Sequence, residues 1–281
     1  MVDEALVAKI EKKAIELQKS IVEMLGPDNA GHLGGSCSSA HIVAALYYSK
    51  MKHSPKDPSW DERDRFIISK GHSVLVQYAA LADFGYFPKE ELSRLKTQEG
   101  ILQGHPDRLK TPGIEMSSGS LGQGLSVAVG LALSLRLRKK TSRVYVVLGD
   151  GELQEGQIWE AAMAASNYRV DNLLAFVDNN GIQATGPIQE RFNSYPIPDK
   201  WKACNWNVLE IDGHSAKQVL AALDEAETVK GRPTVVVAHT VKGKNVSFAE
   251  HNPVFHCGIM SREQYDTALK ELSEKLAAIA E

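Results

Sequence analysis

The chain has 281 residues, of which 24% are charged, and a formal net charge of −3. This length is ample for a sizeable hydrophobic core, whereas the slight acidity argues against a nucleic-acid-binding surface, which would need an excess of basic residues. No apolar run approaches the roughly 18 to 20 residues of a membrane span. Since no repeat, linker or shift in composition divides the chain, we expect residues 1–281 to form one domain.

The first predicted element is an amphipathic helix near the amino terminus. Its apolar residues fall on one helical face, and these are Leu6, Ile10, Ala14, Leu17, Ile21 and Leu25. The segment is acidic and amphipathic, which is not the pattern of a signal peptide. The cysteines at 37, 204 and 257 show no disulfide or zinc spacing, which indicates a reducing, cytoplasmic location.

Five strands and three further helices are predicted along the rest of the chain. The strands are expected at 66–69, 144–148, 173–177, 207–211 and 234–239, and the helices at 121–137, 155–165 and 261–280. Strands that alternate with helices indicate an α/β fold with a doubly wound, mainly parallel sheet and helices on both faces. Several strands are continuous apolar runs, as expected for strands that are covered on both faces.

Polar residues follow two of these strands, with a predicted helix between them. Gly149-Asp150-Gly151 ends the first strand, and Asp178-Asn179-Asn180 ends the second. The carboxyl ends of neighbouring parallel strands meet at one edge of the sheet, where ligands bind in open α/β folds. Asp150, the Asn180 side chain and a carbonyl just after Asn180 suit Mg²⁺ with phosphate oxygens completing its shell. Either motif alone would fit an ordinary turn, but the two together favour a ligand site.

Four of the nine histidines lie beside or near glycines in predicted loops, at His32, His72, His105 and His256. A loop histidine near a phosphate can donate hydrogen bonds, and a neutral one can pass protons near neutral pH. Their spacings match no zinc pattern. A single histidine of this kind would more often be a surface or capping residue, whereas the set of four favours a functional site.

Several of these motifs resemble those of thiamine diphosphate-dependent transketolases. They are GDGELQEG at 149–156 with NN at 179–180, GSLGQG at 119–124, SKGHS at 69–73 and QGHPD at 103–107. The resemblance runs from about Ala30 to Gly258 and covers the amino-terminal, diphosphate-binding half of a full-length transketolase. It implies a thiamine diphosphate-binding fold and the amino-terminal subunit of a split enzyme.

The resemblance also implies a role for each candidate site residue. The metal ligands would be Asp150, the Asn180 side chain and the main-chain carbonyl of Ile182, holding Mg²⁺ or, in its place, Ca²⁺ or Mn²⁺. The cofactor would further be bound by His72, Gly119, Leu121, Gly151, Glu155, Asn180 and His256, with Glu155 at a subunit contact. His32 and His105 would line the substrate channel as the catalytic histidines.

The implied reaction moves a two-carbon ketol unit from a ketose phosphate to an aldose phosphate, by default in the pentose phosphate pathway. In transketolases, the glutamate that contacts the cofactor pyrimidine and the arginines that clamp the sugar phosphate belong to the second half of the polypeptide. We therefore expect the chain to be inactive alone and to join a separate carboxy-terminal subunit in an α2β2 heterotetramer.

The sequence departs from the family pattern at five positions. Leu33 replaces a proline, Ala184 a larger apolar residue, His239 a lysine and Asn245 a glycine, and Cys257 separates His256 from the glycine that usually follows it.

Two alternatives stay open from the sequence. The chain could belong to another thiamine enzyme, such as a 2-oxo-acid dehydrogenase or deoxyxylulose phosphate synthase, or it could be a non-catalytic binding protein on the same fold. The histidine motifs favour transketolase, because 2-oxo acids do not require that set of hydroxyl-binding histidines.

Overall fold

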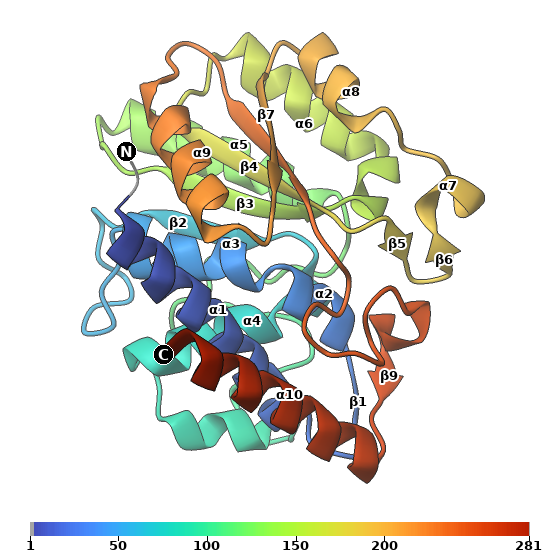
Figure 1. Ribbon diagram of the computed structural model, residues 1–281. Coiled ribbons are helices and arrows are strands. Elements are labelled where there is room, and N and C mark those ends of the chain that lie inside the picture. Colours follow the sequence, from blue (N-terminus) through green and yellow to red (C-terminus); the bar gives the residue numbers. More distant parts are fainter. Residues whose placement is uncertain (1–2, 281) are drawn as a thin grey trace.

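A parallel sheet of five strands lies at the centre of the molecule, with helices on both of its faces (Figure 1). The computed structural model describes residues 3–280. Across the sheet the strands are β2 (Arg65–Ile68), β3 (Val144–Gly149), β4 (Leu173–Asn179), β8 (Thr234–His239) and β7 (Asn207–Asp212). All four neighbouring pairs are parallel, which confirms the predicted α/β class.

The direction in which the chain crosses the sheet decides which face each helix covers. From β3 to β4 the chain steps one way through α6 (Gly156–Asn167), and from β7 to β8 it steps back through α9 (Ala216–Thr228). Right-handed crossovers therefore place α6 and α9 on opposite faces. The face of α6 is also covered by α5 (Gln123–Leu137) and α8 (Ile197–Ala203), and the face of α9 by α1 (Glu4–Leu25), α3 (Ala40–Ala45) and α4 (Leu75–Phe84).

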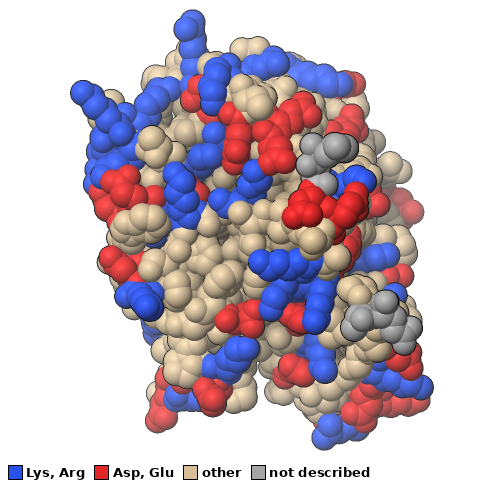
Figure 2. Space-filling view, turned by 60° about the vertical axis from the view of Figure 1, so that its left-hand side comes forward, with Lys and Arg blue, Asp and Glu red and all other residues tan. Residues whose placement is uncertain are grey.

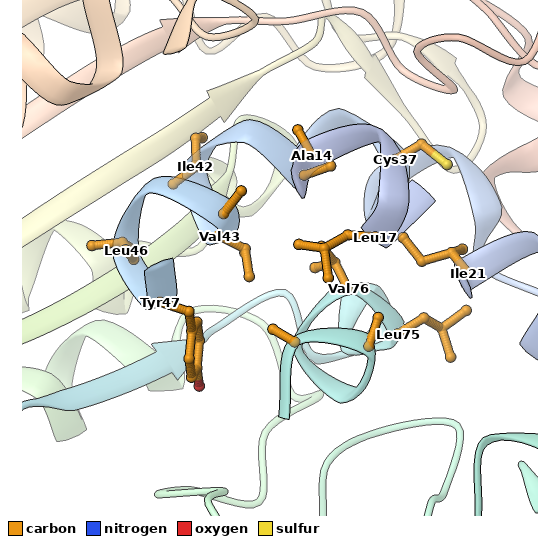
Figure 3. Close-up of a cluster of buried hydrophobic side chains, with 14 of the residues drawn as sticks. Ala14, Leu17, Ile21, Cys37, Ile42, Val43, Leu46, Tyr47, Leu75 and Val76 are labelled. Carbon is orange, nitrogen blue, oxygen red and sulfur yellow. The ribbon is translucent and has the colours of Figure 1, made fainter. Parts of the chain in front are cut away.

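Alternate residues of each strand enter two separate hydrophobic cores. In β3, Tyr145 and Val147 belong to the core under α1, whereas Val146 and Leu148 belong to the core under α5 and α6. This alternation follows from the two-residue period of a strand. In the first core, Leu17 and Ile21 of α1 meet α3 and α4 (Figure 3).

The chain ends bring two long helices together. Helix α10 (Arg262–Ala280) packs along α1, as Figure 1 shows in dark red and dark blue. A capping box begins α10, because Ser261 Oγ accepts from the Gln264 amide at 3.2 Å and Gln264 Oε1 accepts from the Ser261 amide at 3.0 Å. At the other end, the Asp3 side chain caps α1 by accepting from the Ala5 amide.

Shorter elements connect this framework. They are the strand pairs β1 (Ala30–Gly31) with β9 (Gly258–Ile259) and β5 (Ile182–Gln183) with β6 (Gly186–Pro187), the helices α2 (Leu33–Ser38) and α7 (Ile188–Arg191), and helical turns at Leu46–Lys50, Gly71–Ser73, Lys89–Arg94, Gly151–Gln154 and Pro253–His256. Within residues 3–280, no helix is both long and apolar enough to cross a membrane. On the face shown in Figure 2, basic and acidic side chains are interspersed.

Candidate active site

A cavity of about 310 Å³ opens at the carboxyl edge of the sheet. Loops that follow β2, β3 and β4 line it, together with segments from both ends of the chain. All eleven site residues predicted from the sequence lie on its wall, and these are His32, His72, His105, Gly119, Leu121, Asp150, Gly151, Glu155, Asn180, Ile182 and His256. The sheet topology therefore brings together segments that are up to 224 residues apart in the chain.

Asp150 places a buried carboxylate on the cavity wall. Its Oδ1 accepts from the Gly151 amide at 2.8 Å, and its Oδ2 accepts from the Gly181 amide at 2.6 Å. Burial, and then the negative charge of Asp178, raise the pKa of Asp150 to about 6. A nearby cation would relieve both effects, so this environment fits a metal-binding carboxylate.

Asn180 is oriented by a buried ion pair that the sequence analysis did not identify. Lys70 Nζ donates to Asp178, whose side chain is fully buried. Asp178 also accepts from Ser38 Oγ at 2.6 Å and from Asn180 Nδ2 at 3.1 Å. Although burial opposes it, the positive charge of Lys70 lowers the pKa of Asp178. Because the Asn180 NH₂ group donates to Asp178, the Asn180 Oδ1 atom points the other way and can act as an acceptor. It accepts a hydrogen bond from the Ile182 amide at 3.1 Å.

The four predicted histidines form one cluster across the cavity. Ring centroids lie 5.1 Å apart for His32 and His72, 5.9 Å for His32 and His105, 5.6 Å for His32 and His256, and 4.8 Å for His72 and His256. Burial and then His105 lower the pKa of His32 to about 4, and burial and then Lys242 lower that of His256 to about 3. Burial also lowers the pKa of His72 and His105. All four are therefore neutral near pH 7 and can donate or accept a proton.

Lys242 is a second cation at the cavity that the sequence analysis did not identify. Its ammonium donates to the Ile182 carbonyl and to His256 Nδ1, both at 2.8 Å. Burial, and then the charge of Lys70, lower the pKa of Lys242 to about 8. The carbonyl predicted to bind a metal thus already accepts from a cation.

Two further features shape the cavity wall. Gly119 has a φ of +146°, and a Cβ there would lie 2.8 Å from the His105 ring, so glycine is needed for that histidine to fit. Glu152 is buried and joins three loops: it accepts from the Ser69 hydroxyl, from the Gly122 amide at 2.9 Å and from the Gly149 amide at 3.0 Å.

The departures from the family pattern have local explanations at four positions. Leu33 begins α2 and is buried, and His239 is exposed at the end of β8. Asn245 has a φ of +71°, a conformation that glycine adopts freely and asparagine tolerates. Cys257 is exposed, so the additional residue lies at the surface while His256 reaches the histidine cluster. Ala184 lies on the cavity wall.

The donor set fits a diphosphate held through a hard cation. Among residues 3–280, no three His, Cys, Asp or Glu side chains form a metal-binding group. One carboxylate, one amide oxygen and one carbonyl are instead the sparse protein ligation that Mg²⁺ accepts when phosphate oxygens complete its shell. Lys242, Lys70 and the histidines supply the positive charge and hydrogen-bond donors that phosphate requires.

Comparisons with known proteins agree with this chemistry. Residues 10–272 match the family described as transketolase, thiamine diphosphate binding domain. The chain is 42% identical to 6-deoxy-6-sulfo-D-fructose transketolase subunit SqwG of Clostridium sp. (strain MSTE9), covering 95% of this chain and 97% of that protein. It is 37% identical to one of the subunits of apulose-4-phosphate transketolase from Phocaeicola vulgatus, covering 96% of each.

Longer transketolases match over part of their length. Human transketolase is 33% identical over 98% of this chain, which spans 44% of the human protein. A transketolase variant from Pichia stipitis superposes with a TM-score of 0.86 at 31% identity, covering 95% of this chain and 40% of that one. These matches do not favour the alternatives of another thiamine enzyme or a non-catalytic protein. The chain belongs to the transketolase family, as the amino-terminal, thiamine diphosphate-binding subunit of a split transketolase.

Proposed function

We propose that the cavity binds thiamine diphosphate with Mg²⁺ and serves the transfer of a two-carbon ketol unit from a ketose phosphate to an aldose phosphate. One observation carries this proposal: Asp150, Asn180 and the Ile182 carbonyl share a cavity with four neutral histidines. This arrangement combines a cation site, donors for a diphosphate and proton-transferring groups in one place.

Each group at the diphosphate end has a proposed task. Asp150, Asn180 Oδ1 and the Ile182 carbonyl hold the metal, while His72, His256 and the Gly151 amide donate to the diphosphate. Gly119, Leu121 and Glu155 contact the rest of the cofactor, which when bound supplies the electron sink for breaking and forming the carbon–carbon bond. Gly119 and Leu121 are half-buried, whereas Glu155 is exposed at the start of α6.

His32 and His105 are the proposed catalytic histidines. Both line the cavity, and their rings lie 5.9 Å apart. Burial is the first cause of the lowered pKa of each, so both rings are neutral near pH 7. A neutral imidazole can accept a proton from a substrate hydroxyl at one nitrogen and donate at the other.

The second half of the active site is proposed to come from a separate carboxy-terminal subunit. That subunit would supply the carboxylate for the cofactor pyrimidine and the arginines for the sugar phosphate, in an α2β2 assembly. The subunit-length relatives and the 44% coverage of human transketolase support this proposal. The three unpaired thiols support a location in the cytoplasm.

Two substrate classes are proposed. The default is the pentose phosphate reaction, with xylulose 5-phosphate as donor. A specialised sugar is the second, because the subunit-length relatives are named for 6-deoxy-6-sulfo-D-fructose and for apulose 4-phosphate. Comparing kcat/KM for xylulose 5-phosphate and 6-deoxy-6-sulfo-D-fructose in the assembled enzyme would distinguish them, and pyruvate is the control for 2-oxo-acid chemistry.

The metal assignment is tested by Asp150→Asn. We expect this change to abolish Mg²⁺-dependent binding of thiamine diphosphate in titration calorimetry, because it removes the one carboxylate of the proposed metal site. Asp199→Asn, at an exposed position of α8, is the matched control and should bind as the unchanged chain does. Equal affinity for the Asp150→Asn and unchanged proteins would refute the metal site.

The role of His105 is tested separately. We expect His105→Ala to lower kcat of the assembled enzyme at least about 100-fold, the lower end of the usual contribution of a general acid or base, with little change in cofactor affinity. A transketolase assay with xylulose 5-phosphate and ribose 5-phosphate gives kcat, and calorimetry gives the affinity. Unchanged turnover would remove His105 from the catalytic set.

A further inference from the structure

Outside the cavity, a chain of polar groups connects α1, α3 and the start of α9. His41 is buried in α3, and its Nε2 lies 3.0 Å from Glu11 Oε2 of α1. Glu11 Oε1 accepts from the Ala216 amide, the first of α9, at 2.8 Å. The His41 and His214 rings meet edge to face, with centroids 5.4 Å apart. Neither histidine lies on the wall of the active-site cavity.

The positions of the protons in this network follow from its partners. The Val241 amide lies 2.7 Å from His214 Nε2, and an amide N–H can only donate, so this nitrogen carries the lone pair. The Glu11 carboxylate can only accept, so His41 Nε2 carries a proton. Each Nδ1 is buried and has no hydrogen-bond partner among the described residues. The His214 ring is therefore a neutral acceptor, and among the described residues its one hydrogen bond is with the Val241 amide.

Val241 is the residue directly before Lys242, and the surrounding backbone leaves the segment little freedom. The Gly243 amide donates to the Gly34 carbonyl at 3.0 Å, and the Gly213 amide donates to the His239 carbonyl at 2.8 Å. A Cβ on Gly213 would lie 2.5 Å from Thr240, so the loop that carries His214 is pressed against the 240–243 segment. The contact from His214 thus fixes the one amide immediately before the cavity lysine.

We propose that His214 is a positioning residue, which holds the Val241 amide so that the Lys242 ammonium meets the Ile182 carbonyl and His256. The inference deepens the proposed function, because the Lys242 ammonium is useful there only if an anionic diphosphate binds the cavity. Glu11 supports the arrangement indirectly, by tying His41 and the first turn of α9 together behind the His214 ring.

The surroundings of His214 keep its ring in the accepting state. The charged and titratable groups that act on it are His41 of α3, Lys244 of the same segment as Lys242, Asp178 at the end of β4 and Asp212 at the end of β7. Burial, then His41 and Lys244, outweigh the two carboxylates and lower the pKa of His214 to about 4. Protonation at Nε2 would set an N–H against the Val241 N–H and break the contact.

The experiment compares two substitutions in the full-length chain. His214→Phe keeps a ring of similar size but removes the acceptor, whereas the Oε1 atom of His214→Gln can replace Nε2. We expect His214→Phe to speed hydrogen exchange of the Val241 amide about tenfold and to weaken Mg²⁺–thiamine diphosphate binding about tenfold, the effect of one lost hydrogen bond. His214→Gln should restore most of the exchange protection of the Val241 amide and most of the cofactor affinity. Exchange is followed by NMR and binding by calorimetry.

His53→Phe is the matched control, because His53 is another half-buried histidine whose Nε2 lies 2.9 Å from the Tyr47 carbonyl, away from the cavity. It should leave the Val241 exchange and the cofactor affinity unchanged. Unchanged exchange in His214→Phe, or equal acceleration in His214→Phe and His214→Gln, would overturn the proposal.

A measurement on the unsubstituted chain covers the case in which His214→Phe does not fold. The ¹⁵N shift of His214 Nε2 should be that of an unprotonated ring nitrogen near pH 7, and a protonated shift would overturn the proposal. Absence of cofactor binding in the unsubstituted chain would instead refute the proposed function, and the exchange comparison would still decide whether His214 positions this segment.

Discussion

At the scale of single residues, the site depends on buried charges whose partners come from distant segments. Glu152 accepts from Ser69, Gly122 and Gly149, so one carboxylate fixes three loops around the cavity. Burial raises the pKa of Glu152 despite these bonds. Both of its oxygens face donors, which makes this position intolerant of an NH₂ group.

Glu152→Gln should lower the free energy of unfolding by about 1 to 3 kcal/mol, the typical penalty for leaving a buried donor without an acceptor. The amide NH₂ would meet either the Gly149 or the Gly122 N–H, because each carboxylate oxygen accepts one of them. Urea unfolding measures the change, and Glu160→Gln at an exposed position of α6 is the control. Equal unfolding midpoints for the two variants would contradict the structural role of Glu152.

The spaced motifs of the sequence predicted which candidate residues meet at one cavity, but not the side-chain pairs that orient them. Asp150 and Asn180 could be placed together because parallel strands share an edge. Lys70 and Asp178 lie within recognised motifs, yet their pairing depends on side-chain directions that no spacing encodes. His214 follows β7 and Lys242 follows β8, the neighbouring strand. Their hydrogen bonds depend on the conformations of the loops after these strands, which the sequence pattern does not specify.

At the scale of elements, the strands were predictable to within about two residues because burial on both faces makes them continuous apolar runs. The predicted strand at 234–239 coincides with β8, and the others differ by one or two residues at their ends. The helix predicted from 121 begins at Gln123 because Gly122 has a φ of +85°. Helix α2 is buried along its whole length and therefore shows no amphipathic pattern.

The packing of α1 on α4 gives a prediction about pH. Asp83, near the end of α4, accepts from Lys13 Nζ at 2.8 Å, Tyr48 Oη at 2.7 Å and Lys89 Nζ at 3.0 Å. Burial alone would raise the pKa of Asp83, but the bonds from Lys13, Tyr48 and Lys89 lower it to about 2. In the unfolded chain the pKa of an aspartate is about 4. The charged Asp83 carboxylate therefore stabilises the fold above pH 4, and this stabilisation is lost as the pH falls toward 2.

Asp83→Asn should therefore destabilise the protein by about 1 kcal/mol at pH 7, an amount limited by partial exposure of the ion pairs. The difference in the free energy of unfolding between Asp83→Asn and the unchanged chain should become smaller between pH 4 and pH 2. Urea unfolding at pH 7 and pH 3 measures both values, with Asp199→Asn as the exposed control. A difference that stays constant over this range would show that the charge of Asp83 is not the cause.

At the scale of the whole molecule, the cavity lies at the carboxyl edge of the sheet, and the carboxylates on its wall differ in burial and in hydrogen bonding. Its carboxylates come from Asp150, Glu152 and Glu155. The first two already accept from backbone amides, and the third is exposed at the start of α6. Among the described residues, the wall of the cavity that we propose as the diphosphate end of the cofactor site thus has no buried, uncommitted carboxylate for the pyrimidine end.

We therefore expect the chain purified alone, with thiamine diphosphate and Mg²⁺, to give no ketol transfer, and expect turnover to appear when the carboxy-terminal subunit is added. The physical reason is that cofactor activation needs a carboxylate at the pyrimidine, which a partner must bring to the exposed rim of the cavity. A coupled assay with xylulose 5-phosphate measures turnover, and native mass spectrometry measures the mass of the complex. Asp150→Asn with the same partner is the control, because it should assemble normally yet remain inactive. Full turnover by the isolated chain would show that its own residues complete the site.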